Sequence, residues 1–463
     1  MQRFAWLLAV PVLACDSSAE PTALDIPETY AFESRFEADA SSVAYAGQTF
    51  RHVLIEAIAL EMEAIGEEID GGAVFEPGVV SARLSFYYDF DPETAGELRH
   101  PLSTDPAPLQ SLWSDIGGAD LVSKTAGNDR EPQHRDWDVD LLGWDGTTNP
   151  EGVVRELIEA CDALAVAYAS GQVPLDPSGA AIPKWYVSAD GIDHQQLLQK
   201  FLLGAVTYSQ GTDDYLDEGL TADNAAPEED AAYTALEHQW DEGFGYWGGA
   251  RNYLEYTDDE VAGADGRPAF ASGYQDHDAD GAIDLWSEYN FGASVNAAKR
   301  DRGAAAAGVE LDYSAQTMQA FLHGRAIIAA ADGPLSASQR ADLEAQRDLA
   351  VDGWERSLAA TAVYYFNDTL KDMASDDYVF VDHAKHWSEL KGFLLTLQFN
   401  PRAQVSRETL STIHDLVGRA PVSPLDPDAD AYAQDLVTAR GLLADAYGFD
   451  ATLVGDAAGE GGW

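Results

Sequence analysis

Apolar side chains recur at three- and four-residue intervals through several long segments, and this helical period constrains the fold more than any other feature. The segments are 46–70, 194–211, 313–333, 336–373 and 431–449. We therefore predict a mainly α-helical protein made of two packed helical bundles with long ordered loops. One run, SARLSFYYDF at 81–90, alternates in polarity instead, which predicts a short strand or an extended loop.

The charge balance narrows the classes of partner. The chain has 463 residues, of which 80 are acidic and 27 basic, giving a net charge of −53. Nucleic acid is excluded as an expected partner, because phosphate binding needs a positive surface. Hydrophobic residues still make up 46% of the chain, so we expect a folded core beneath a solvated acidic surface.

The N-terminal stretch MQRFAWLLAVPVLAC predicts export. Its apolar run is too short to span a bilayer, and it ends at Cys15 in the pattern of a bacterial lipoprotein signal. We expect residues 1–14 to be a signal peptide, Cys15 to be lipidated and residues 15–29 to be a tether to the membrane. The alternative is an ordinary secretory signal with a chance cysteine. The other cysteine, Cys161, has helical apolar neighbours, which predicts a buried thiol and no internal disulfide.

The rest of the chain divides into a helical domain at 30–424 and a C-terminal helix and tail at 425–463. Within the domain we expect two halves, at about 30–255 and 285–424, with a loop at 258–288 between them. The tail GDAAGEGGW, which begins at Gly455, is expected to fray because it is short, polar and rich in glycine.

The loop DHDADGAIDLWSE, residues 276–288, is similar to the first three-quarters of an EF-hand calcium loop. Gly281 permits the sharp turn and Ile283 can anchor the loop to the core. The candidate calcium ligands are Asp276, Asp278, Asp280, Asp284 and Glu288. Glu288 comes one position later than the usual closing ligand. The alternative is a solvated acidic turn, and a bound calcium ion would be structural rather than a signal.

Two helical histidine clusters are candidate sites for a transition metal such as iron or zinc. In ALEHQWDEGFGYWGG, His238 shares a helix face with Asp241 and Glu242. In HAKHWSE, His386 lies three residues before Glu389. The alternative for each cluster is a buried hydrogen-bond network. Residues expected to contact the ligand or support its binding are Tyr246, Trp247, Arg251 and Lys385.

Several motifs resemble, in order, those of a bacterial lipoprotein family known as domain of unknown function 4856. They include YAFESRF, KFLLGAVTYSQGTDDYL, YTALEHQWDEGFGYWGGARNY, DADGAIDLWSEYNFG, WERSLAATAVYYFND and HAKHWSELKGFLLTLQFNP. The resemblance implies a relation to, or association with, imelysin-like proteins, which are extracytoplasmic helical bundles linked to iron acquisition. Their GxHxxE motif is matched in part by His386 and Glu389, with Ala384 in place of the glycine.

These observations predict a non-enzymatic, lipid-anchored metal- or ligand-binding protein on the periplasmic or cell-surface side of the bacterial envelope. We expect it to take part in iron or other metal uptake beside an outer-membrane transporter or an imelysin-like protein, with calcium as a structural cofactor. The first alternative is an imelysin-type metallopeptidase or other hydrolase. The second is a structural surface lipoprotein with an acidic docking face.

Overall fold

A computed structural model describes residues 24–129, 133–147 and 149–463, so Cys15 and the signal peptide lie outside the described residues. The described chain is mainly α-helical, as predicted, and apart from isolated β-bridges it forms no strand. Its longer helices are α1 (Ala46–Asp70), α2 (Val79–Tyr88), α5 (Pro150–Ala169), α6 (His194–Leu202), α7 (Ala235–Trp247), α9 (Gly292–Ala306), α10 (Tyr313–Ala330), α11 (Ala337–Ala374), α12 (Phe380–Thr396), α13 (Arg407–Val417) and α14 (Ala429–Tyr447). The short helices are α3 (Pro92–Ala95), α4 (Trp113–Ile116) and α8 (Asp258–Val261).

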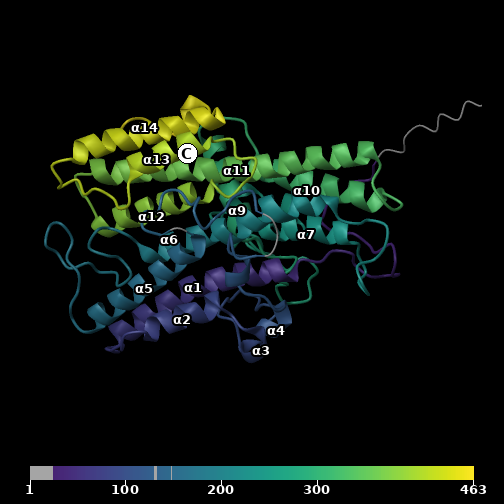
Figure 1. Ribbon diagram of the computed structural model, residues 1–463, viewed down its shortest axis with the longest axis horizontal. Coiled ribbons are helices and arrows are strands. Elements are labelled where there is room, and N and C mark those ends of the chain that lie inside the picture. The colour runs from purple at the N-terminus through teal and green to yellow at the C-terminus, as the bar shows by residue number, and fades with distance from the viewer. Residues whose placement is uncertain (1–23, 130–132, 148) are drawn as a thin grey trace, which may run out of the picture.

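Helix α11 organises the packing of the other helices. It has 38 residues, and at 1.5 Å per residue it is about 57 Å long. Helix α10 packs along it towards one end of the molecule and α12 towards the other (Figure 1), while α9 and α14 also contact it. The helices at the two ends of the molecule therefore share α11. A single continuous cluster of buried side chains joins the two ends.

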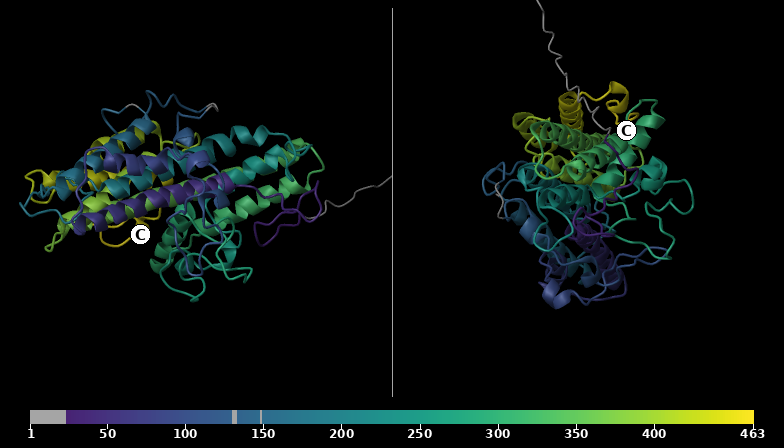
Figure 2. Two further views of the ribbon diagram at one scale, coloured as in Figure 1. Left: turned by 90° about the horizontal axis from the view of Figure 1, so that it is seen from below. Right: turned by 90° about the vertical axis from the view of Figure 1, so that its right-hand side faces the viewer.

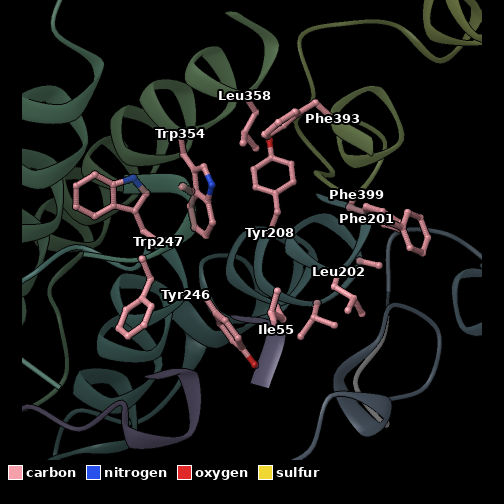
Figure 3. Close-up of a cluster of buried hydrophobic side chains, with 14 of the residues drawn as sticks. Ile55, Phe201, Leu202, Tyr208, Tyr246, Trp247, Trp354, Leu358, Phe393 and Phe399 are labelled. Carbon is pink, nitrogen blue, oxygen red and sulfur yellow. The ribbon is translucent and has the colours of Figure 1, made fainter. Parts of the chain in front are cut away.

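Large aromatic side chains fill the centre of this core. Figure 3 shows Trp354 of α11 between Trp247 of α7 and Tyr208 of the segment that continues α6. All three are fully buried, and the Tyr208 and Trp354 rings meet edge to face at 5.3 Å. Aromatic pairs in this arrangement add to the stabilisation that comes from area burial alone. The same core lies beneath the loops of residues 258–291, which project from one side of the helices (Figure 2, left).

The strand or extended loop predicted at 81–90 is wrong, because these residues lie mostly in helix α2. Val80, Leu84 and Tyr88 are spaced at four residues and all three are buried. The N-terminus of α2 is closed by Asp162 from α5, whose carboxylate accepts hydrogen bonds from the backbone of Gly78, Val80 and Ser81 at 2.8–3.1 Å. Tertiary contacts thus overrode the local alternation, and a distant capping residue cannot be seen in the local sequence.

The tail that was expected to fray is ordered instead. Trp463 is only 5% exposed, its ring meets that of Phe449 at 4.8 Å, and its indole N–H donates to the backbone carbonyl of Arg300 at 3.1 Å. The terminal tryptophan outweighs the flexible glycines before it, because burying so large a side chain is strongly favourable. Cys161 is a buried free thiol, as predicted. No helix among the described residues is long and apolar enough to cross a membrane.

A buried ionic cluster joins the N-terminal segment to α7 and α10. Arg325 of α10 is fully buried and donates to Glu237 at 3.0 Å and to Asp241 at 2.8 Å, and both acids are themselves fully buried. It also donates to the hydroxyl of Ser42, while the Tyr30 hydroxyl donates to Asp241 at 2.7 Å. Every charge in the cluster therefore has a partner of opposite sign, which burial requires.

We expect Arg325→Met to lower the free energy of unfolding by about 3–5 kcal/mol, because it leaves the buried Asp241 without its counter-ion and Glu237 with only Arg35, at 3.8 Å. Denaturant titration measures this change. Arg302→Met is the matched control, since Arg302 pairs with Asp259 on the surface, and we expect a change below about 1 kcal/mol for it. Equal losses in the two variants would contradict a dominant role for the buried cluster.

Candidate functional site

The calcium-like loop brings three of its five predicted ligands together. Carboxylate oxygens of Asp276, Asp278 and Glu288 all lie within 4.8 Å of one another. Gly281 has a φ of 91° at the turn, which a side chain would disfavour. Glu288 is 4% exposed, and its carboxylate accepts backbone hydrogen bonds from His277 at 2.6 Å and from Asp284 at 2.7 Å. The closing acid therefore reaches into the loop although it comes one position late.

The other two predicted ligands shape the loop. Asp280 accepts from the backbone of Ala282 at 2.8 Å. Asp284 accepts from the side chain of Gln110 at 2.7 Å and from the hydroxyl of Ser287 at 2.6 Å. Ile283 is fully buried, as predicted, and exchanges backbone hydrogen bonds with residues 107 and 109. The loop is thus fixed to the preceding long connection on one side and carries its convergent acids on the other.

His238 is partly exposed between two glutamates. Its Nδ1 lies 3.0 Å from Glu228 and its Nε2 lies 3.7 Å from Glu242. If a metal ion lay between Nε2 and the Glu242 carboxylate, Glu228 would orient the imidazole ring through its contact with Nδ1. Asp241 faces the other way, because its two oxygens accept from Arg325, Tyr30 and the backbone of Ala44. The structure gives Asp241 an ion-pair role, and its predicted role as a metal ligand stays untested.

His386 lies in α12, beside the C-terminal end of α11 and remote from His238 of α7 (Figure 1). Its Nδ1 is 2.7 Å from Asp372. Burial lowers the pKa of His386, but the hydrogen bond and charge of Asp372 outweigh burial, and the net pKa is raised. Glu389 lies instead against Tyr365, whose hydroxyl donates to it at 2.8 Å, and against Lys200 at 3.7 Å. The two histidines therefore have separate carboxylate partners, and one ion cannot be shared between them.

The residues predicted to contact a ligand have different surroundings. Tyr246 and Trp247 are fully buried in the aromatic core (Figure 3), which gives them a packing role. Arg251 donates to the hydroxyl of Tyr45 at 3.0 Å, and its backbone N–H donates to the carbonyl of Ser287 at 2.7 Å. Arg251 thus supports the end of the calcium-like loop, and Tyr45 reaches the same loop by donating to the carbonyl of Trp286.

Sequence reasoning missed two adjoining clefts beside this loop. The larger, of about 880 Å³, lies between α8, α9, α11 and the C-terminal tail. The smaller, of about 340 Å³, is lined by residues 289–292 at the base of the loop, together with residues of α6, α9 and α12. Both clefts are lined by Ala262, Lys299 and Tyr365. Of the predicted residues, Glu389 lies in the smaller cleft.

A buried acid pair also escaped prediction. Helix α6 continues through π-helical turns at Leu203–Tyr208 and Gln210–Tyr215, a rare geometry that often marks functional positions. In the second of these, Asp214 is 5% exposed, and neither of its carboxylate oxygens has a hydrogen-bond partner among the described residues. Burial and the neighbouring Asp129 and Asp213 raise the pKa of Asp214 to about 10. The signal in the sequence was the acid pair Asp213 and Asp214, just after the periodic helical segment 194–211.

We expect stability to fall with rising pH because of Asp214. The folded chain keeps this proton up to a pKa of about 10, whereas the unfolded chain releases it near pH 4. The stabilisation is therefore complete at low pH and is lost between pH 4 and 10, by up to about 1.4 kcal/mol per pH unit. Asp214→Asn has no proton to lose, so its unfolding free energy should change less from pH 5 to pH 9. Parallel pH profiles for the two proteins would contradict this assignment.

The fold and these sites define an all-α protein with an acidic loop site and two adjoining clefts, the smaller of which lies at the base of the loop. Residues 148–415, more than half of the chain, match the family model described as a domain of unknown function (DUF4856). The chain belongs to this family. The matched span runs from α5 into α13 and includes the calcium-like loop, both histidine clusters and α9. No curated protein and no solved structure matches the chain.

Proposed function

We propose that this chain is a non-enzymatic binding protein of the bacterial cell envelope, anchored through a lipid on Cys15, whose 276–288 loop holds a structural calcium ion. The observation that carries this proposal is the convergence of Asp276, Asp278 and Glu288 within 4.8 Å. Hard carboxylate oxygens are the ligands that calcium prefers, and calcium is millimolar outside many cells. An ion there would hold the loop whose base lines the smaller cleft.

The biological role that we propose is metal uptake, with iron as the expected metal and an outer-membrane transporter or imelysin-like protein as the partner. Support comes from the partly exposed His238, whose Nε2 is 3.7 Å from a Glu242 oxygen. That spacing leaves room for an ion bonded to both atoms, since metal–nitrogen and metal–oxygen bonds are each about 2.0–2.2 Å. His386, oriented by Asp372, offers a second imidazole of the same kind.

Calcium should raise the melting temperature relative to the protein in chelator. At a calcium concentration a hundredfold above the Kd, the gain is about 2.7 kcal/mol. The double variant Asp276→Asn, Asp278→Asn should lose this response. The double variant Asp376→Asn, Asp377→Asn removes the same charge from an exposed turn and should keep it. A melting temperature that does not respond to calcium in the unmodified chain would defeat the calcium site.

Metal analysis of the purified protein tests the transition-metal role. We expect bound iron or zinc to fall in part in His238→Ala and in part in His386→Ala, because the two histidines have separate partners. Unchanged metal content in both variants would remove this part of the proposal. Peptide hydrolysis that is lost in Glu242→Gln or Glu389→Gln would instead support the metallopeptidase alternative.

A further inference from the structure

Arg300, in the wall of the larger cleft, is a buried cation without an ion-pair partner. It is 7% exposed, and no carboxylate among the described residues lies within ion-pairing distance of it. Its Nε and Nη1 atoms are buried without a hydrogen-bond acceptor in the described part of the chain. The guanidinium lies over the ring of Tyr364 at 4.2 Å. Since buried charges are normally paired, and this chain has 80 acidic residues, an unpaired buried arginine points to an absent anion.

Further positive charge gathers around the same clefts. Lys299 is exposed in the wall that the two clefts share, and Lys200 lines the smaller cleft. Desolvation by the cleft walls and the positive charges of Lys200 and Arg300 lower the pKa of Lys299, and Lys385 acts in the same direction. Three of the seven lysines of the chain thus influence one small region of a strongly acidic protein.

The nearby acids are largely engaged with other groups. Asp301 accepts backbone hydrogen bonds from Tyr313 and Ser314, each at 2.8 Å. Asp259 pairs with Arg302 at the outer rim, Asp368 pairs with Lys371, and Asp258 receives the Ser314 hydroxyl. In the smaller cleft Glu56 faces Lys200 and Lys299, and Glu389 pairs with Lys200. These contacts leave Arg300 and Lys299 available to an anion from outside.

We propose that the larger cleft binds a small organic anion, whose carboxylate or phosphate group accepts hydrogen bonds from Arg300 and is paired with Lys299. Tyr364, Tyr365 and Trp463 line the same cleft and offer aromatic surface to the organic body of the ligand. A volume of about 880 Å³ is in the range of small-molecule sites. This inference names the ligand class of the binding protein proposed above and rests on that role, but not on the calcium or histidine sites.

Calorimetric titration of the full chain with phenyl phosphate and with benzoate tests the proposal. Both probes carry an aromatic ring and an anionic group, and the stronger binder identifies which oxyanion the site accepts. Benzamide has the shape of benzoate without its charge and should not bind. We expect Arg300→Gln and Lys299→Gln each to weaken binding at least tenfold. Arg340→Gln and Lys184→Gln remove the same charges outside the clefts and should leave binding unchanged.

A second readout separates ligand binding from a structural role of Arg300. Without ligand, Arg300→Gln should unfold at the same or a higher denaturant concentration, because it relieves a buried unpaired charge. Failure of both anions to bind the unmodified chain, or equal binding to Arg300→Gln, would overturn the proposal. The calcium response is measured on the same proteins, so loss of one site is distinguished from loss of the other.

Discussion

The buried pairing of Arg325 with Glu237 and Asp241 is the interaction on which the packing of α7, α10 and the N-terminal segment depends. It fixes α10 against α7, and through Tyr30, Ser42 and Ala44 it fixes the N-terminal segment across both helices. That segment continues to Tyr45, which reaches the calcium-like loop at Trp286. A cluster of three charges in the core is therefore connected, through one short piece of backbone, to the site proposed for calcium.

Much of the fold could be predicted from local sequence, because long helices show the three- and four-residue spacing of apolar side chains. The 46–70 segment forms α1 with the predicted bounds, and the 336–373 segment matches α11 to within a residue at each end. The same reasoning gave the wrong result at α2, because packing against α1 and α5 stabilises a helix there although apolar residues alternate in its sequence. The prediction was also wrong for the tail, where the burial of Trp463 stabilises an ordered conformation despite the flexible glycines before it.

The candidate sites also differ in whether they could be predicted from the sequence. The calcium-like loop was visible because its candidate ligands are close in sequence, and even the late Glu288 could be included. The Arg300 cleft was not visible, because its walls come from residues that are distant along the chain, such as Asp258, Lys299, Tyr365 and Trp463. What distinguishes Arg300 is the lack of a partner among the described residues, and only a three-dimensional arrangement can reveal that.

The π-helical turns after α6 have a consequence for how this family diverges. Each hydrogen bond there spans one more residue than in an α-helix, so the segment behaves as an insertion held inside a continuous helix. A relative that lacks a single residue between Leu203 and Tyr215 could keep the helix yet turn Asp213 and Asp214 to another face. A one-residue gap at this point in an alignment would therefore mark members that have lost the buried acid pair.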